Sequence, residues 1–238
     1  MNNLWVVIPT YNDRANLAAL VGRLFKLELP LSVLVVDDAS PDGTGRLAEE
    51  LARRYAGKFF VLHRASKFGL GSAYREGFAY AMARGASVVG EMDADLSHNP
   101  EDLPRLWQKL AAGAEVAVGS RRVRGGKIKG WGWWRHLMSW GANAVARLIL
   151  GLKTHDVTAG FRLYQVKVLQ RVPWRQVKSE GYAWQEEILF LLERAKANIA
   201  EVPVVFNDRS HGKSKLRARD IKEFFVTLAR LKLKKYPT

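Results

Sequence analysis

Short apolar runs alternate, through the first half of the chain, with longer segments whose apolar residues recur every three or four positions. The run LWVVIPTY (residues 4–11) is typical of a parallel strand buried on both faces. In residues 12–27, one helical face collects four aliphatic side chains, those of Leu17, Leu20, Val21 and Leu24. A strand followed by an amphipathic helix is the repeating unit of an α/β fold, so the pattern predicts a doubly wound, mostly parallel sheet flanked by helices.

The same alternation extends to Arg121. Further strands are expected at residues 32–40, 58–64, 86–95 and 114–121, and helices at 44–56, 72–85 and 100–113. Beyond Arg121 the order changes: a helix near 134–150, a strand within 156–164, a helix at 182–197, a strand at 199–206 and a last helix from about Ala218. The chain shows no repeat and no low-complexity linker. One domain, residues 1–238, with a C-terminal elaboration is therefore expected.

Composition places the chain among globular proteins and gives it a strong positive charge. Its 238 residues are 48% hydrophobic and carry a formal net charge of +15. This charge favours anionic partners such as nucleic acid, lipid headgroups or phosphorylated substrates. It gathers in residues 121–135, with six basic residues and no acid, and after His211, with nine Lys or Arg against two acids. The absence of cysteine excludes disulfides and thiolate metal sites and agrees with a reducing compartment.

Neither a targeting segment nor a membrane span is expected. The N-terminus lacks the basic region and apolar run of a signal peptide, and no window offers the roughly 18 apolar residues of a membrane span. The most apolar candidate, residues 137–150, is interrupted by Asn143 and Arg147. The sequence thus favours a soluble or peripheral protein.

Polar side chains follow three of the predicted strands where each strand ends: Thr10–Asp13, Asp37–Asp38 and Asp93–Asp95. A single loop aspartate is usually a cap or turn residue. Three such groups at one edge of a sheet, where ligands bind in these folds, indicate a site instead. An Asp-x-Asp pair can place carboxylate oxygens on a hard divalent cation that also bridges a diphosphate. Asp38 could accept hydrogen bonds from a ribose or a base.

Eight motifs, in order along the chain, carry a family resemblance: VVIPTYND, VVDDASPDGT, KFGLGSAYREG, MDADLSHNPEDLP, VGSR, DVTAGFRLY, EGYAWQEEIL and HGKSKL. From about Trp5 to Lys215 the chain resembles the family-2 glycosyltransferases, and among them the dolichol- or polyprenol-phosphate mannose synthases that lack transmembrane segments. The resemblance implies a GT-A fold, a GDP-mannose donor, a dolichyl or polyprenyl phosphate acceptor, an inverting reaction and a Mg²⁺ or Mn²⁺ cofactor. It also implies a nucleotide-sugar half, about 1–121, and an acceptor- and membrane-facing half, about 122–238.

Positions within these motifs imply the roles of individual residues. The residues implied to line the nucleotide pocket are Pro9, Tyr11, Asp13, Val36 and Asp38. Ala94 and Asp95 are implied to face the donor diphosphate. Asp93, Asp95 and Ser97 occupy the metal-motif positions, and because some relatives have glutamine in place of Ser97, water is expected between this serine and the metal. Asp95 and Arg121 are the residues expected to carry catalysis.

The basic residues acquire roles from the same resemblance. Arg121, Arg209 and Lys215 match positions that bind the phosphates of the substrates, and Arg135 and Ser139 fall where the acceptor phosphate is expected. Arginine's planar fork suits bidentate contact with phosphate, whereas a lysine supplies a point charge. The alternative for any one of these arginines is a solvated surface charge.

The chemistry of the implied acceptor removes the need for a strong general base. A phosphate monoester has a second pKa near 6, so its attacking oxygen is already mostly ionised at neutral pH. Catalysis then consists of orientation and charge stabilisation. The five histidines show no metal-ligand spacing, and His98, close to the Asp-x-Asp pair, is expected to be structural.

Tryptophans alternate with basic residues in GWGWWRHLMSW, residues 130–140. This composition is typical of an element at a membrane interface, and the alternative is a folded flap with the tryptophans in its core. The last helix is likewise either an amphipathic anchor or a packed helix. We expect a peripheral protein on the cytoplasmic face of a membrane, with a separate membrane subunit as an open possibility.

Two other functions compete with this interpretation. Within the class, the alternative is a polyprenyl-phosphate glucosyltransferase that uses a UDP-sugar, since the base is read largely by backbone contacts. The other is a basic nucleic-acid-binding protein. It leaves the strand-end aspartates unexplained, because carboxylates repel a phosphate backbone without a metal, so no nucleic-acid partner is expected.

Overall fold

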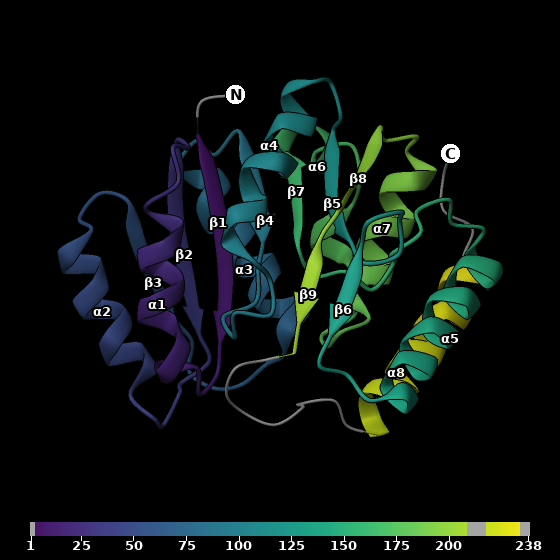
Figure 1. The fold of residues 1–238 in the computed structure, drawn as a ribbon, viewed down its shortest axis with the longest axis horizontal. Helices are drawn as coiled ribbons and strands as arrows, with labels where there is room; N and C mark the ends of the chain where they lie inside the picture. Colours follow the sequence, from purple (N-terminus) through teal and green to yellow (C-terminus); the bar gives the residue numbers. More distant parts are fainter. Residues whose placement is uncertain (1–2, 209–217, 234–238) are drawn as a thin grey trace.

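A computed structural model describes residues 3–208 and 218–233 of the chain, and its core is one twisted sheet (Figure 1). Within these residues seven strands pair in the order β3-β2-β1-β4-β7-β5-β8. All neighbours are parallel except where β7 pairs antiparallel with β4 and β5. The strands are β1 (Leu4–Thr10), β2 (Leu31–Asp37), β3 (Phe59–His63), β4 (Val88–Glu91), β5 (Val116–Ser120), β7 (Arg162–Gln165) and β8 (Ile199–Pro203). The predicted doubly wound, mostly parallel sheet is confirmed.

Alternate residues of the central strands pack on opposite faces of the sheet, as the pleat requires. Leu4, Val6 and Ile8 of β1 face one core, which also holds apolar residues of α1 (Arg14–Leu24), α2 (Thr44–Arg54) and α4 (Leu103–Ala111). Trp5 and Val7 face a second core, shared with α3 (Leu70–Ala83), α6 (Val166–Leu169) and α7 (Trp184–Arg194). Because both faces are covered, the strands read as continuous apolar runs.

The second half of the chain completes this sheet. β7 lies between β4 and β5, so residues on both sides of position 121 share one core. The segment 199–206, expected to form one strand, is divided: β8 ends at Pro203, and β9 (Val205–Asn207) pairs with β6 (Lys127–Lys129) in a separate sheet. Between the two strands, the Val204 amide donates to the carbonyl of Ser120, the last residue of β5. β6 was not predicted, since KIK has no apolar period.

Helix boundaries are close to expectation. The segment at 100–113 begins as a 3₁₀ turn, Pro100–Asp102, which fits a proline at a helix start, and continues as α4. A second 3₁₀ turn spans Trp174–Gln176. The segment 156–164, expected to be strand-like, pairs only from Arg162 onward.

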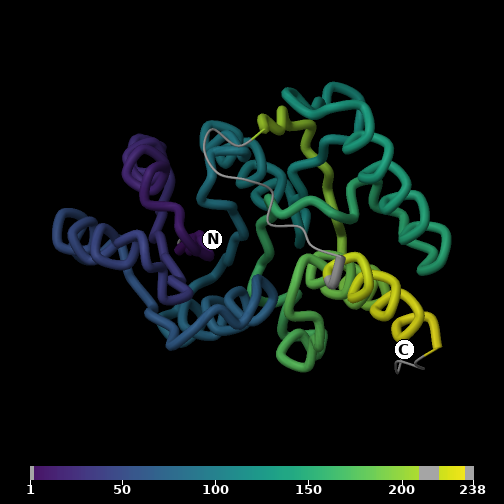
Figure 2. Tube along the Cα trace, turned by 90° about the horizontal axis from the view of Figure 1, so that it is seen from below, coloured from purple at the N-terminus to yellow at the C-terminus, as the bar shows by residue number. Residues whose placement is uncertain are grey.

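Two long helices lie side by side at one end of the molecule (Figures 1 and 2). They are α5 (Trp133–Leu150) and α8 (Ala218–Leu233). Large apolar side chains on both helices stay exposed, including Trp133 at 75% and Leu148 at 84% of their surface. Within residues 3–208 and 218–233, no helix is long and apolar enough to cross a membrane.

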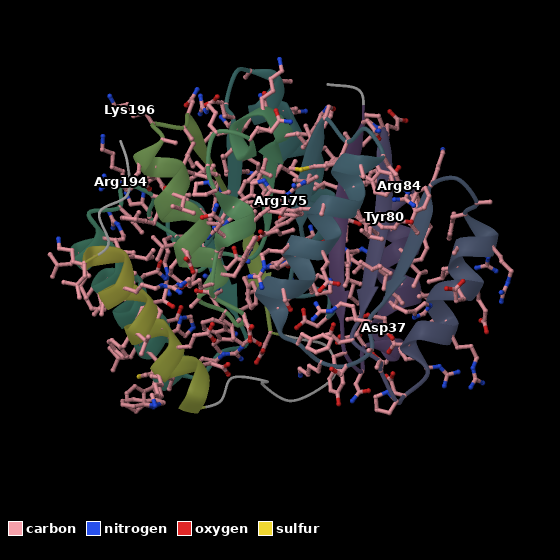
Figure 3. All side chains as sticks on the ribbon, turned by 180° about the vertical axis from the view of Figure 1, so that it is seen from behind. Asp37, Tyr80, Arg84, Arg175, Arg194 and Lys196 are labelled. Carbon is pink, nitrogen blue, oxygen red and sulfur yellow. The ribbon has the colours of Figure 1, made fainter. Side chains whose placement is uncertain are left out.

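Strand direction places the loops that follow β1, β2 and β4 at one edge, the lower edge in Figure 1. Each of these loops contains a non-glycine residue with a left-handed backbone: Asn12 (φ 60°), Ala39 (φ 54°) and Leu96 (φ 62°). Such conformations are uncommon outside glycine and cluster at functional sites. In Figure 3, Asp37 at the end of β2 marks this edge, and Arg84 is labelled toward the opposite end. The Arg84 guanidinium lies 3.5 Å from the centre of the Tyr80 ring.

Candidate functional site

A pocket opens at the edge where β1, β2 and β4 end, as the sheet topology predicts. Seven residues singled out from the sequence line it: Pro9, Tyr11, Asp13, Asp38, Asp93, Ala94 and Asp95. The strand ends that carry them are far apart in sequence but adjacent in the sheet, since β1 pairs with both β2 and β4. The pocket therefore brings together the three groups of carboxylates.

Sequence reasoning missed the other wall of the pocket. It consists of Lys67, Gly69 and Leu70 from the loop into α3, of Gly181 and Tyr182 before α7, and of Asp220 in the first turn of α8. The motifs KFGLG and EGYAW contain most of these residues, so the signal was present. Nothing in the sequence indicated, however, that these two motifs lie next to each other and line the same pocket as the Asp-x-Asp pair.

The loop after β1 is held by its own aspartate. The Asp13 carboxylate accepts the amide of Tyr11 at 2.9 Å, and the Asp13 amide donates to Thr44 Oγ1 at 3.1 Å. The Tyr11 ring in turn lies 4.1 Å beneath the Lys67 ammonium. The loop after β1 therefore contributes an aromatic ring to the pocket, and the loop into α3 adds a cation beside it, a combination suited to a base and to phosphates.

The adjacent aspartates after β2 have different tasks. Asp37 accepts hydrogen bonds from Thr10 Oγ1 (3.1 Å) and Ser40 Oγ (2.5 Å), which fix the loop backbone. Asp38 lines the pocket, and its Oδ1 lies 3.2 Å from Nε of the buried Arg64. Burial raises the pKa of Asp38 to about 6, although the nearby Arg64 and Lys67 oppose the shift. A buried carboxylate with this environment is suited to accept hydrogen bonds from a ligand.

The loop after β4 arranges the Asp-x-Asp pair. Asp95 is buried, and its Oδ1 accepts the amide of Ser97 at 3.1 Å. The Asp93 amide donates to His98 Nδ1 at 3.2 Å, which makes that nitrogen the acceptor. Burial lowers the pKa of His98 to about 4, so the ring is neutral, and it stacks on Phe161 at a centroid distance of 5.2 Å. His98 is thus a structural support of the loop.

A divalent cation fits this loop only together with a ligand. Asp93 and Asp95 both line the pocket, and the Oγ atom of buried Ser97 has no hydrogen-bond partner in the described part of the chain. Among the same residues no group of three or more His, Asp or Glu gathers to hold a metal. Because such cations take six or more oxygen ligands, a cation in this loop would need further oxygen ligands beyond these side chains, such as those of a bound substrate and water.

A buried polar cluster supports the end of β4, just before the Asp-x-Asp pair. The Glu91 carboxylate, fully buried, accepts Trp184 Nε1 at 2.7 Å and Tyr164 Oη at 3.1 Å, and burial raises its pKa. Arg162, also fully buried, donates to the carbonyls of Gln185 and Val157, both at 2.8 Å. Glu91 stands two residues before Asp93, so these bonds fix the point where the strand ends. No periodic pattern in the sequence signals such a cluster.

Arg121 and Val36, both expected at the donor, lie outside the pocket lining. The Arg121 guanidinium forms a bidentate pair with fully buried Asp156, at 2.7 Å and 2.6 Å, and also donates to Thr158 Oγ1. Val36 is fully buried in the core against Gly77 of α3, so it has no exposed surface for a ligand to contact. Arg121 is therefore tied to the 156–158 loop rather than aimed freely at the donor.

The residues expected at the acceptor phosphate also have partners. Arg135 pairs with Asp208 at 2.8 Å and lies 4.0 Å above the Trp131 ring. Ser139 Oγ accepts a hydrogen bond from Arg122 Nη2 at 2.7 Å. The other two cations expected at phosphates, Arg209 and Lys215, lie outside the described residues.

Fold, pocket and motifs define the class of the protein. The sequence profile of Glycosyl transferase family 2 matches residues 5–172, more than half of the chain. The chain belongs to this family of glycosyltransferases, as its motifs predicted.

Among named proteins, the polyprenol monophosphomannose synthase of Mycolicibacterium smegmatis is 45% identical over 224 residues, which cover 94% of this chain and 84% of that protein. The undecaprenyl-phosphate mannosyltransferase of Micrococcus luteus is 42% identical, with 94% and 91% covered. A similar solved structure is glucosyl-3-phosphoglycerate synthase from Mycobacterium tuberculosis in complex with Mn²⁺, UDP and phosphoglyceric acid. Its TM-score is 0.68 at 20% identity, with 99% of this chain and 80% of that chain covered, which shows the shared fold.

Proposed function

We propose that this protein transfers mannose from GDP-mannose to a polyprenyl or dolichyl phosphate, with inversion at the sugar carbon. The observation that carries the proposal is the convergence of Asp38, Asp93 and Asp95 on one pocket of a family-2 glycosyltransferase. The names of two relatives above 40% identity support a polyprenyl phosphate acceptor and mannose as the sugar. GDP-mannose as the donor is what the resemblance of the motifs to the polyprenol-phosphate mannose synthases implies.

In the proposed reaction the protein supplies position and charge. Asp38 accepts hydrogen bonds from the nucleoside, and Tyr11 with Lys67 forms the opposite side of the nucleotide site. Asp93 and Asp95, together with Ser97, would hold a Mg²⁺ or Mn²⁺ ion. Such an ion neutralises charge on the departing nucleoside diphosphate. Arg121, held by Asp156, adds a fixed positive charge behind the diphosphate.

Proton transfer by a protein base is not part of the proposed chemistry. The acceptor phosphate has its second pKa near 6 and arrives as an ionised nucleophile at neutral pH. The imidazole nearest to the Asp-x-Asp pair, that of His98, accepts a backbone amide through Nδ1 and stacks on Phe161. Its geometry and burial support a structural role, in keeping with a site that orients two phosphates.

We also propose that the enzyme works at a membrane surface, on its cytoplasmic face. Exposed apolar side chains line the paired helices α5 and α8, among them those of Trp134, Trp140 and Phe225. Arginines and lysines of the same region add attraction to anionic lipid, about 1 kcal/mol for each one near the surface. Arg135 and Ser139, at the start of α5, are proposed to meet the acceptor phosphate where this surface adjoins the site.

A nucleotide-binding screen followed by a transfer assay tests the proposal. Thermal unfolding is measured with GDP and with UDP, each with and without Mn²⁺, and we expect selective stabilisation by GDP with the metal. Transfer is then assayed from GDP-mannose and from UDP-glucose to a short polyprenyl phosphate. Stabilisation by UDP together with transfer of glucose would establish the glucosyltransferase alternative. A protein that neither nucleotide stabilises and that transfers neither sugar would contradict the proposal.

A further inference from the structure

The C-terminal helix α8 reaches the rim of the pocket, although its sequence carries no donor-binding motif. Asp220 in its first turn lines the pocket, beside Gly181 and Tyr182. Figure 2 shows α8, in yellow, between α5 and the segments that precede α7. The outer side of α8 carries the exposed side chains of Ile221, Phe225, Val226 and Leu233. α8 is therefore in contact with both the proposed donor site and the proposed membrane surface.

The segment Ser179–Tyr182, which we call the clamp segment, rests on the N-terminus of α3. The Gly71 amide donates to the Glu180 carbonyl at 2.7 Å. A Cβ atom at Gly69 would lie 2.4 Å from the Glu180 carbonyl oxygen, and one at Gly71 would lie 2.2 Å from that of Ser179. Only glycine permits so close an approach of two backbones, which gives the GLG of the KFGLG motif a physical reason.

Two carboxylates hold the clamp segment from its other side. Glu223 of α8 accepts the amides of Glu180 at 2.8 Å and Gly181 at 3.1 Å. Glu187 of α7 accepts the amide of Ser179 at 3.0 Å and its hydroxyl at 2.6 Å. Consecutive backbone amides of the clamp segment are thus bound by side chains of two different helices. Hydrogen bonds to an ionised acceptor are about twice as strong as neutral ones.

The contacts of α8 with the clamp segment come from one face of the helix. Glu223, Thr227 and Arg230 are spaced by four and three residues, so they project on the same side. Arg230 pairs with the buried Glu187 and donates to Ser179 Oγ at 3.3 Å, and Thr227 Oγ1 lies 3.2 Å from the same hydroxyl. The part of α8 that meets the clamp segment is therefore polar and specific. It lies beside the buried Leu228 and Leu231, while the outer face of the helix is apolar and exposed.

We infer that Glu223 is a positioning residue for the donor: through the clamp segment, α8 sets the wall of the nucleotide-sugar pocket formed by Gly181 and Tyr182. The inference rests on the proposed binding of a nucleotide and metal in this pocket. Without Glu223, the amides of Glu180 and Gly181 lose their acceptor. The pocket wall formed by Gly181 and Tyr182 can then move away from α3. The donor has to order this wall when it binds, which lowers its affinity.

The test compares Glu223→Ala and Glu223→Gln with Lys222→Ala, a change at the neighbouring, exposed position of the same helix. Calorimetry measures the affinity for GDP with Mn²⁺, without acceptor or lipid. We expect Glu223→Ala to bind about tenfold more weakly, the equivalent of roughly 1.4 kcal/mol for the two lost bonds. Glu223→Gln should lose less, because its amide oxygen still accepts, and Lys222→Ala should match the wild type.

Steady-state kinetics separate positioning from a merely structural role. A positioning role raises the donor KM and leaves the acceptor KM and kcat close to those of the wild type. A structural role lowers the active fraction, and hence the apparent kcat, at an unchanged donor KM. If Glu223→Ala does not fold, Glu223→Gln carries the test, with its thermal unfolding midpoint as the control.

Unchanged GDP affinity and donor KM in the folded Glu223 variants would overturn the inference. A wild-type protein that binds no nucleotide with Mn²⁺ would overturn the proposed function and the inference together, a result that the first titration reveals. If the wild type binds UDP in place of GDP, the same comparison is made with UDP. The base assignment then fails, while a tenfold loss in Glu223→Ala still supports the role of α8.

Discussion

The edge of the sheet and the paired helices α5 and α8 both depart from the usual distribution of residues. The sheet edge buries charged side chains, and the helices expose apolar ones. At the sheet edge, carboxylates are buried, with Asp38 at 6% and Asp95 at 8% exposure. On the helices, large apolar side chains are exposed, with Trp133 at 75%. Charged groups are rarely buried unless paired, and contiguous apolar surface is rarely left in water. Each region fits the ligand proposed for it: a cation and a diphosphate at the sheet edge, and an apolar surface at the helices.

The two regions also differ in how firmly the fold fixes their side chains. The carboxylates stand at the ends of strands that are hydrogen-bonded on both sides, over the buried bonds of Glu91 and Arg162. The exposed tryptophans project from α5, whose other face packs on the body of the protein. A reacting pair of phosphates needs fixed geometry, whereas adsorption to a bilayer needs only area and charge.

The largest effect is expected from Asp95→Ala, which should abolish transfer. The side chain is proposed to hold the cation and the diphosphate. It accepts the Ser97 amide within its own loop, outside the strands, so the fold should persist. Activity at saturating Mn²⁺ and circular dichroism check this expectation, with exposed Glu28→Ala as the control. Retention of more than about a tenth of wild-type turnover would contradict the role, since loss of an electrostatic contact of this kind costs on the order of 100-fold.

Arg121→Lys should reduce both activity and stability. Lysine keeps the charge but loses the fork that binds Asp156 at two oxygens and also reaches Thr158. Because Asp156 is fully buried, we expect a loss of about 2 kcal/mol in the free energy of unfolding, measured with urea. Arg122→Lys, which affects the single bond to Ser139, is the matched control. Normal kinetics and stability in Arg121→Lys would reduce this arginine to a dispensable charge.

Replacing the tryptophans of residues 131–140 should affect either membrane binding or stability, depending on whether the ring is exposed or packed. Trp133, Trp134 and Trp140 are exposed, so their replacement by alanine should weaken co-sedimentation with anionic vesicles at low salt. It should also slow turnover on long-chain acceptors more than on short ones. Trp131 packs edge-on against Phe206 at 5.5 Å, so Trp131→Ala should lower the unfolding temperature instead. Equal vesicle binding by the wild type and the triple variant would make this segment an internal flap.

The smallest effect is expected from the titration of Asp38. Its pKa of about 6 lies above the usual range, so lowering the pH through 6 protonates it and removes a hydrogen-bond acceptor from the pocket. Affinity for GDP-mannose, measured without acceptor, should therefore fall below pH 6 and be constant above it. Asp38→Asn should bind more weakly and lose this dependence. GDP-mannose carries no phosphate monoester, so a pH dependence that persists in Asp38→Asn would belong to another protein group.

Much of the site could be predicted from local sequence, because the end of each apolar run marks the end of a strand. The apolar runs end at Thr10, Asp37 and Glu91. Because parallel strands place their ends at one edge, the sequence predicts which carboxylates meet at the pocket. The motifs then indicated the family, which the match over residues 5–172 confirms. The roles proposed for individual residues remain predictions.

The clamp segment and Arg121 show what escaped prediction. KFGLG and EGYAW lie more than a hundred residues apart, and only the packing of α3 against the segment before α7 brings them together. The same is true of Arg121, whose guanidinium is fixed by Asp156 from a distant loop. Such contacts depend on the three-dimensional path of the chain, because no local period or spacing encodes them.

The sequence by itself determined the alternation of strands and helices, the edge at which the carboxylates meet, the excess of positive charge and the family. These features depend on periodicity and on nearest neighbours along the chain. Only the tertiary structure decided which carboxylate faces the pocket, which tryptophans stay exposed and which helix supports the donor wall. Asp37 and Asp38 are adjacent in sequence, yet one is bound by Thr10 and Ser40 and the other lines the pocket. The physical reason is that burial and hydrogen-bond partners come from elements distant in the chain, and these set what each side chain can do.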